Sequence, residues 1–235
     1  MSSTAALILA GGYGKRLRPL TDERPKPLLE VAGRPIIVWQ VEWLKAHGIT
    51  DVVVAVGYLK EKIIEALGSG SKYGVSISYV VEDEPLGTGG AVRNARSVLG
   101  SRDRFIVVNG DIITNLDPEE VLRALERPNV IGAVALVPLR SPYGIVEIGN
   151  GLVKSFREKP ILTDYWINAG VYAFKPEIFE YLPEKGDIER ETFPRLAAEG
   201  RLAAVTFDLT KYYWRSIDTH KDLEEASSEL SAWRR

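Results

Sequence analysis

The chain contains no cysteine, and this absence removes several kinds of chemistry at once. Disulfide bonds, thiolate catalysis and cysteine-based metal sites are all excluded. Histidine is scarce as well, because only His47 and His220 occur and they lie far apart in the sequence. Catalysis by histidine therefore has little support. A single methionine and a single glutamine (Gln40), together with the missing cysteine, are typical of proteins from thermophilic sources, in which thermolabile residues are few.

A long apolar run is also missing from the 235 residues. No segment approaches the roughly 20 apolar residues that span a bilayer, so we expect no membrane partner. The first apolar run, residues 5–10, is too short for a signal peptide and has no basic segment before it, which favours a cytoplasmic location. The formal net charge is −2, with both signs interspersed, whereas nucleic-acid-binding proteins usually carry a basic face. We therefore expect no nucleic-acid partner.

The first half of the chain alternates apolar runs with helical patterns. Within residues 35–47, for example, Ile37, Val41 and Leu44 share one helical face, and Gly48 follows the end of the pattern. Such alternation predicts βαβ units and a mainly parallel sheet. The predicted strands are residues 5–10, 51–56, 75–81 and 104–108, and the predicted helices are residues 35–47, 59–67, 87–99 and 117–127.

Beyond residue 130 the pattern changes to short strands. Gly149, Asn150 and Gly151 separate two of these strands and are typical of a hairpin turn. The predicted fold class is therefore α/β: a Rossmann-like first half, a mixed and mainly parallel central sheet with helices on both faces, and a β-hairpin insertion in the second half. The predicted strands of this half are residues 130–137, 144–148, 152–157, 168–174 and 213–217, and Thr219 is predicted to begin a last helix.

Positive charge gathers in AGGYGKRLRPLTDERPKPL, residues 10–28, which hold three glycines, three prolines and five basic residues. A glycine-rich loop after a buried strand can approach a phosphate closely and expose its N–H groups to it. The segment is not a P-loop, because Leu9 stands where that motif needs its first glycine. It is not a dinucleotide fingerprint either, because Leu17 replaces the third glycine. The basic residues suit a triphosphate; the alternative is a solvated surface loop.

The same segment closely resembles the opening motif of the sugar-1-phosphate nucleotidyltransferases, GGxGxRLxPLTxxxPKPL. Later stretches occur in the order of that family: EPLGTGGAVRNA, VVNGD, YGIVEI, FREKP, NAGVYAF and WRSID. The resemblance implies a Rossmann-like nucleotide-diphospho-sugar transferase fold that forms a single catalytic domain over residues 1–235. The chain departs from the family at Lys15, where serine or threonine is common. It also shows no C-terminal left-handed β-helix of the kind that many relatives carry.

The resemblance implies transfer of a nucleotidyl group from a nucleoside triphosphate to a sugar 1-phosphate, with release of pyrophosphate. The attacking phosphate is largely dianionic near neutral pH, because its second pKa is about 6, so positioning and electrostatics should carry the catalysis. Arg16, Lys26 and Asp111 match the family's catalytic residues, the first two as cations that contact phosphate. Asp111 and Asp218 match its magnesium ligands, although each aspartate could instead cap a helix. The resemblance also implies a homodimer or homotetramer.

Further residues match family positions around the two substrates. The expected nucleotide-binding residues are Ala10, Gly11, Gly12, Gly14, Lys15, Glu82, Pro85, Gly87, Thr88 and Gly110. The expected sugar-phosphate-binding residues are Tyr143, Gly144, Glu158, Lys159, Asn168 and Gly170. For Glu158 and Lys159 the alternative is an exposed ion pair, worth less than about 1 kcal/mol.

Glu82, at the end of the third predicted strand, is the residue that we expect to select the base. An ionised carboxylate only accepts hydrogen bonds, so it suits the N1–H and N2 amino group of guanine and would repel the carbonyl oxygens of thymine or uracil. EPLGTGG also resembles mannose and heptose 1-phosphate guanylyltransferases, so GTP and mannose 1-phosphate are the favoured substrates. The alternatives are thymidylyl or uridylyl transfer to glucose 1-phosphate, and a regulatory homologue without catalysis. Glu82 could also belong to a solvated acidic turn with Asp83 and Glu84.

Overall fold

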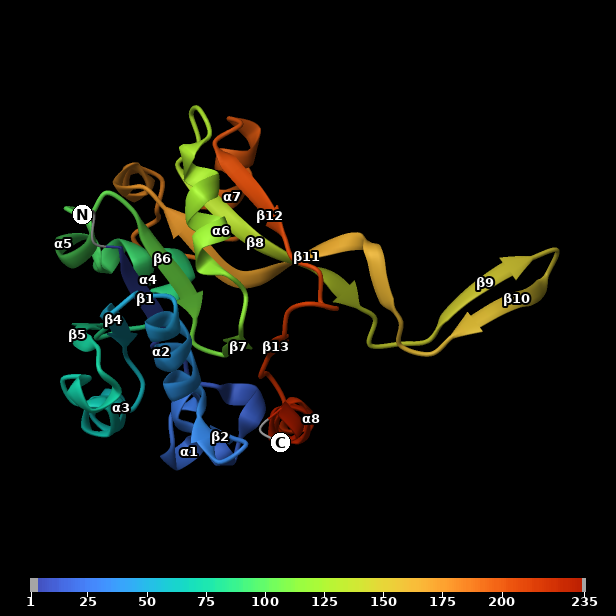
Figure 1. The fold of residues 1–235 in the computed structure, drawn as a ribbon, viewed down its shortest axis with the longest axis horizontal. Coiled ribbons are helices and arrows are strands. Elements are labelled where there is room, and N and C mark those ends of the chain that lie inside the picture. The colour runs from blue at the N-terminus through green and yellow to red at the C-terminus, as the bar shows by residue number, and fades with distance from the viewer. Residues whose placement is uncertain (1–3, 234–235) are drawn as a thin grey trace.

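A computed structural model of the chain describes residues 4–233, so the ends of the predicted domain, residues 1–3 and 234–235, lie outside the described residues. A mixed seven-stranded sheet runs through the centre of this part of the molecule (Figure 1). The strand of residues 161–174 is antiparallel to both of its neighbours, and the remaining neighbouring pairs are parallel. The order across the sheet is β12 (Leu202–Thr206), β8 (Gly132–Arg140), β11 (Ile161–Phe174), β6 (Phe105–Asn109), β1 (Ala5–Ala10), β4 (Asp51–Val56) and β5 (Ser76–Val81).

The strand sequences explain why the sheet is buried on both faces. β1 reads AALILA, and its side chains alternate between two apolar clusters: Ala6 and Ile8 belong to one, Ala5 and Leu7 to the other. Parallel strands covered on both faces are usually apolar throughout. β1 pairs in parallel with both β4 and β6, so the carboxyl ends of these strands meet at one edge of the sheet.

Helices cover both faces, as the two apolar clusters show. The predicted α/β fold with a mixed, mainly parallel sheet is therefore confirmed. The first face carries α2 (Ile36–Ala46), α3 (Lys60–Leu67) and α6 (Pro118–Arg123), and the second carries α4 (Gly87–Asn94), α5 (Arg96–Leu99) and α7 (Thr192–Ala198). Short 3-10 helices complete these layers: η3 (Ser71–Tyr73), η4 (Ala124–Glu126) and η5 (Pro176–Glu180).

Several elements differ from the prediction. The predicted helix 87–99 is broken at Ala95 into α4 and α5, because Ala95 leaves helical backbone angles (φ −81°, ψ 5°). β11 begins at Ile161, well before the predicted start at residue 168, because its first half pairs with β8 although it contains polar residues. β12 and α7 were not predicted, since LAAVT and TFPRLAA are too short to show a period. β7 (Ile112–Thr114) pairs with β13 (Trp214–Ser216), a contact between distant segments.

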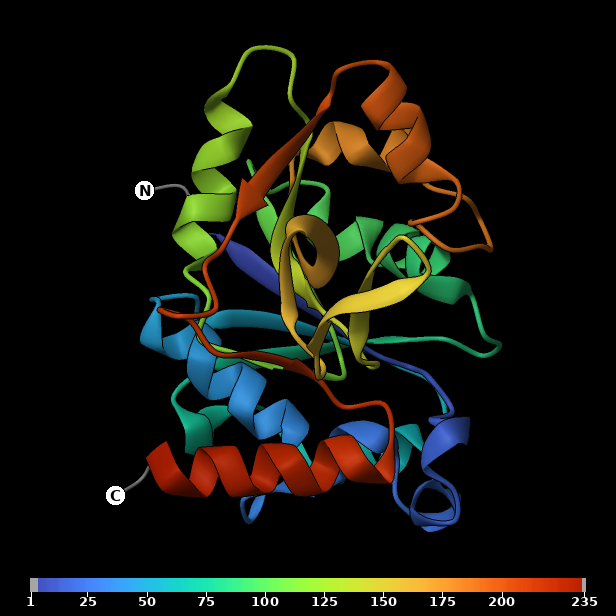
Figure 2. The same ribbon diagram turned by 90° about the vertical axis from the view of Figure 1, so that its right-hand side faces the viewer.

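The opening segment, which follows β1 in the sequence, folds into short helices and turns and does not form a long open loop. The last helix, α8 (His220–Trp233), lies across this end of the molecule (Figure 2). Its residues Ala226 and Leu230 share a third apolar cluster with Leu17 of the opening segment. The predicted last helix is confirmed and supports the opening segment. That segment contains η1 (Lys15–Leu17), α1 (Leu20–Glu23), η2 (Lys26–Leu28) and the strand pair β2 (Glu30–Val31) and β3 (Arg34–Pro35).

A hairpin projects far from the rest of the molecule (Figures 1 and 2). β9 (Ile145–Gly149) and β10 (Leu152–Arg157) pair with each other, and among the described residues neither strand joins the central sheet. Asn150 and Gly151 turn the chain with positive φ angles of 54° and 75°. The predicted hairpin insertion is confirmed, and we call residues 145–157 the arm. Within residues 4–233, no helix has both the length and the apolar character needed to cross a bilayer.

Candidate active site

A cavity of about 420 Å³ opens at the carboxyl ends of β1 and β6, the edge at which open α/β sheets bind ligands. The opening segment, the turn between β5 and α4, and the segment after β6 form its walls. Every residue predicted for catalysis, nucleotide binding or metal binding lines this cavity. These residues are Ala10, Gly11, Gly12, Gly14, Lys15, Arg16, Lys26, Glu82, Pro85, Gly87, Thr88, Gly110, Asp111 and Asp218.

Glycine is required at two points of the cavity wall. Gly14 has a φ of +61°, and a Cβ atom there would lie 2.9 Å from Thr21 Cγ2. Gly87 has a φ of +75°, and a Cβ atom there would lie 2.5 Å from the carbonyl oxygen of Gly186. Both the left-handed backbone and the lack of space exclude larger residues. The wall therefore presents main chain, which can approach a ligand closely.

A charged cluster lies at one side of the cavity. Lys26 Nζ lies 2.7 Å from Asp111 Oδ2 and 3.1 Å from Asp218 Oδ1, and Arg16 lies 2.8 Å from the same Asp218 oxygen. The Ser216 hydroxyl donates to the other Asp218 oxygen at 2.8 Å. Burial raises the pKa of Asp218, but the neighbouring Lys26, Ser216 and Arg16 outweigh burial and hold it below its usual value. Asp218 is therefore ionised at neutral pH.

The two aspartates fit a magnesium site that is completed by substrate. Their carboxylates converge on one ammonium group, so both already face a single cation. Among residues 4–233 no cluster of three or more acidic or histidine side chains could hold a metal ion by itself. Magnesium commonly takes only one or two carboxylates and completes its coordination with phosphate oxygens and water. Two hard oxygen ligands are therefore a suitable donor set.

Glu82 is a buried carboxyl group in the cavity wall, with 8% of its surface exposed. Burial raises its pKa, and the long contact from the Leu86 N–H, 3.5 Å, opposes this only in part. Asp83 and Glu84 are exposed, so the solvated acidic turn includes these two residues and not Glu82. Gly11 packs against the carboxyl group, since a Cβ atom there would lie 3.0 Å from Glu82 Oε1.

The first turn of α4 is held by a neighbouring loop. The N–H groups of Gly89 and Gly90 donate to the carbonyl oxygen of Gly186 at 2.9 and 3.3 Å. The Thr88 hydroxyl donates to Glu189 at 2.7 Å and accepts the Ile188 N–H at 2.9 Å. These N–H groups are therefore not free to bind phosphate, and Thr88 is fixed by protein contacts although it lines the cavity.

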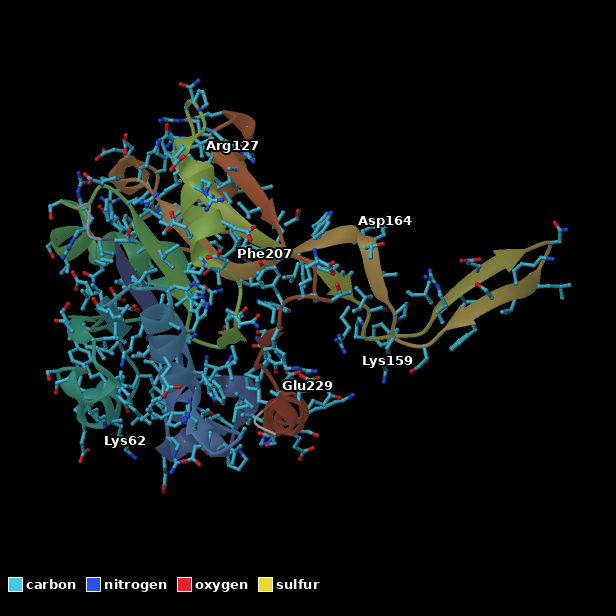
Figure 3. All side chains as sticks on the ribbon, in the orientation of Figure 1. Lys62, Arg127, Lys159, Asp164, Phe207 and Glu229 are labelled. Atoms are coloured by element: carbon cyan, nitrogen blue, oxygen red, sulfur yellow. The ribbon has the colours of Figure 1, made fainter. Side chains whose placement is uncertain are left out.

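The residues predicted to bind the sugar phosphate do not line the cavity. Tyr143, Gly144, Glu158 and Lys159 flank the base of the arm, and Figure 3 shows Lys159 there, outside the main body. Lys159 Nζ lies 3.7 Å from Glu158 Oε1, and both side chains are exposed. This is the exposed ion pair that was the alternative interpretation of these two residues. Asn168 and Gly170 lie on β11, beside the cavity residue Asn109: a Cβ atom on Gly170 would be 3.0 Å from Asn109 Nδ2.

Several residues of the cavity wall were not predicted from the sequence. Asn109 directly precedes Gly110 in VVNGD, so the motif itself was a signal for it. Tyr13 lies in the opening motif, and its ring packs on Tyr58 with centroids 5.0 Å apart. Asp187 had no signal, because it lies in a loop about 100 residues after the α4 turn that it faces. The full set of missed residues is Leu9, Tyr13, Leu17, Pro27, Ala91, Asn109 and Asp187.

A glycine-lined cavity that presents both cations and carboxylates at the carboxyl ends of parallel strands is typical of the class of nucleotide-binding α/β proteins. Comparison with known sequences identifies the family within this class. The pattern of the Nucleotidyl transferase family matches residues 5–232, and the chain belongs to this family. The expected family resemblance is confirmed.

Several relatives and solved structures are similar to the chain. Mannose-1-phosphate guanyltransferases of Yarrowia lipolytica and Candida albicans are 40% and 39% identical over 92% of this chain, which spans 61% of their length. HddC of Yersinia pseudotuberculosis has a TM-score of 0.77 and 27% identity, with 97% of this chain and 99% of that one covered. A second HddC structure, complexed with GMP-PN, has a TM-score of 0.75 and 26% identity over the same shares. A Bacillus anthracis protein described as a glucose-1-phosphate thymidylyltransferase has a TM-score of 0.76 and 28% identity, with 96% and 94% covered.

Proposed function

We propose that the chain transfers a nucleotidyl group from a nucleoside triphosphate to a sugar 1-phosphate and releases pyrophosphate. One observation carries the proposal: Arg16, Lys26, Asp111 and Asp218 form one charged cluster beside a glycine-lined cavity. The family match and the mannose-1-phosphate guanyltransferase relatives support the same reaction. Retention of both cations and both carboxylates is an argument against a regulatory homologue without catalysis.

The reaction asks for charge compensation more than for proton transfer. A sugar phosphate oxygen attacks the α-phosphorus in line with the leaving pyrophosphate, and this oxygen is already ionised near neutral pH. Arg16 and Lys26 would bind the phosphates and stabilise charge that grows on the leaving group. Asp111 and Asp218 would hold a magnesium ion, which when bound neutralises charge on phosphate oxygens. Lys26, now paired with both aspartates, would turn toward substrate phosphate.

GTP and mannose 1-phosphate are the substrates that we propose. Glu82 is a buried acceptor in the cavity wall, which matches the two adjacent donors of guanine. The relatives named as mannose-1-phosphate guanyltransferases and the HddC complex with GMP-PN support a guanine nucleotide. Tyr143, Gly144, Glu158 and Lys159 are proposed to contact the sugar phosphate, which requires the base of the arm to approach the cavity. Asn168 and Gly170 are proposed to contact the sugar from β11.

The test is a pyrophosphate-release assay with purified protein across the common nucleoside triphosphates and several hexose 1-phosphates. We expect magnesium-dependent turnover that is fastest with GTP and mannose 1-phosphate. Turnover with dTTP or UTP and glucose 1-phosphate would show that the proposed substrates are wrong and that the proposed reaction is right. A chain that binds nucleotide sugars tightly and releases no pyrophosphate would establish the regulatory alternative. We further propose a single catalytic domain, a cytoplasmic location and a homodimer or homotetramer.

A further inference from the structure

A chain of hydrogen bonds links the α4 turn to β11 behind the cavity wall. The Thr88 hydroxyl donates to Glu189 Oε2 at 2.7 Å, and the Tyr172 hydroxyl donates to Glu189 Oε1 at 3.1 Å. The Asn168 amide donates to the Tyr172 oxygen at 2.8 Å, and its oxygen accepts the Gly170 N–H at 2.8 Å. Glu189 therefore connects one proposed nucleotide-binding residue with two proposed sugar-binding residues.

The direction of each hydrogen bond is set by its neighbours. The Ile188 N–H donates to the Thr88 hydroxyl at 2.9 Å, so the proton of Thr88 is left for Glu189. The Asn168 amide donates to the Tyr172 oxygen, so the proton of Tyr172 is also left for Glu189. An ionised carboxylate accepts both protons, one on each oxygen. An amide at position 189 would turn its NH₂ group toward one of the two hydroxyls, which would then have to accept a further hydrogen bond and leave its own proton without an acceptor.

β11 needs this support at the point where it carries Asn168. Its pairing with β8 shifts register between Asn168 and Tyr172, and Gly170 in between has a φ of +68°. Tyr172 is fully buried, and burial together with the charge on Glu189 raises the pKa of its hydroxyl, which therefore remains a donor. A buried hydroxyl that is engaged on both sides holds its partners strongly, because an unpaired one is costly.

We propose that Glu189 and Tyr172 are positioning residues that couple the nucleotide and sugar-phosphate subsites. The inference rests on the proposed function, because the coupling has meaning only if Thr88 and Asn168 contact the two substrates. Loss of the Tyr172 hydroxyl disturbs the sugar side most, since Thr88 keeps its bond to Glu189 and the cavity residue Asn109 loses only a long contact of 3.5 Å with Tyr172. Loss of the Glu189 carboxylate disturbs both sides.

The test compares Tyr172→Phe, Glu189→Gln and the double variant. For each we would measure the nucleotide Kd by calorimetry, and KM for the sugar 1-phosphate and kcat by pyrophosphate release. Tyr212→Phe is the matched control, because the Tyr212 hydroxyl donates to Glu120 at 3.0 Å, a bond of the same kind that is not part of the cavity wall. Thermal unfolding of every variant checks that the fold is retained.

We expect Tyr172→Phe to raise KM for the sugar 1-phosphate about tenfold, the effect of one hydrogen bond, and to leave the nucleotide Kd unchanged. Glu189→Gln should raise both constants, and the double variant should be no worse than Glu189→Gln. Glu189→Gln carries the test by itself if Tyr172→Phe does not fold.

Two results would overturn the inference while leaving the proposed function in place. The first is an active wild type in which Tyr172→Phe and Glu189→Gln behave like Tyr212→Phe. The second is a Tyr172→Phe variant that weakens the binding of both substrates equally, as a general structural defect would. A wild-type chain that forms no nucleotide sugar from any substrate pair would instead refute the proposed function, and the inference with it.

Discussion

Lys26 lies between Asp111 and Asp218, and this arrangement leads to a prediction at the residue scale. Asp111→Asn should lower kcat at least ~100-fold, because only one of the two carboxylates would remain to hold a cation beside the phosphates. Initial rates at rising magnesium concentration check this. Near-normal turnover of Asp111→Asn at saturating magnesium would show that Asp111 is not a metal ligand.

Glu82 leads to a prediction about the base. Wild type should prefer GTP to dTTP and UTP, and Glu82→Gln should lose at least ~10-fold of that preference, the size of one hydrogen-bond pair at ~1.4 kcal/mol. The ratio of kcat/KM for the three nucleotides measures it. Glu84→Gln is a control, because Glu84 is an exposed acid of the same turn. Equal preference in wild type and Glu82→Gln would remove Glu82 from base recognition.

The raised pKa of Glu82 also predicts how pH acts. In the folded protein the ionised carboxyl is penalised, so its cost to stability is absent below the ordinary pKa of 4.5 and complete above the raised value. Glu82→Gln should therefore unfold at a higher temperature than wild type at pH 7, and the difference should vanish at acidic pH. GTP affinity should fall as Glu82 is protonated, and only in wild type. Thermal unfolding measures the first effect and calorimetry of GTP binding the second, each from acidic pH to pH 7.

At the scale of elements, α8 is held to β13 by one arginine. Arg215 donates to Glu225 and Glu229 at 2.8 Å each, and its side chain is only 13% exposed. Asp218, a cavity residue, lies between the two elements. The arginine therefore links the position of the last helix to the cavity.

Arg215→Met should lower the free energy of unfolding by ~2 kcal/mol, because it removes a largely buried guanidinium and both of its close ion pairs to α8. The measurement is denaturant unfolding. Arg96→Met is the control, since its 2.9 Å pair with Glu180 is exposed and should contribute less than ~1 kcal/mol. Equal losses in the two variants would show that Arg215 does not hold α8 more strongly than a surface pair.

At the scale of the whole molecule, the arm has an apolar face that the described chain does not cover. Ile148 is opposite Val153 and Val146 is opposite Phe156, and all four side chains are exposed. A bulge between Val153 and Ser155 keeps Val153 and Phe156 on the same face. A two-stranded hairpin is only marginally stable by itself, so we expect a second copy of the chain to cover this face.

Replacing Ile148 and Phe156 with serine should therefore weaken self-association. Light scattering after gel filtration, at high and low protein concentration, measures the mass. Glu147→Ser is the control, because Glu147 lies opposite Ser155 on the other face of the arm and should leave the mass unchanged. A monomeric wild type would contradict the expected homo-oligomer.

The fold class and the nucleotide side of the cavity were predictable because their signals are local. β1 and, after Asp51, β4 are continuous apolar runs, both strands have the predicted bounds, and the opening motif keeps fixed spacings between its glycines and cations. Glu82 follows directly after one predicted strand and Asp111 follows another after Asn109 and Gly110, and the carboxyl ends of parallel strands meet at one edge of a sheet. Spacing along the chain was therefore enough to bring these residues to one cavity.

The remaining features depend on contacts between distant segments, which only the tertiary structure decides. Lys26 meets Asp218 across 192 positions, and Thr88 meets Glu189 across 101. No local sequence pattern predicts which distant carboxylate accepts the hydrogen bond that Lys26 or Thr88 donates. Contacts between distant segments also set the direction of the arm. The base of the arm continues from β8 and β11, so it leaves the cavity in a direction that depends on how these two strands pair, and not on the residues of the hairpin. Short-range chemistry thus determined the elements and the motif, and packing of distant segments determined which partners they meet.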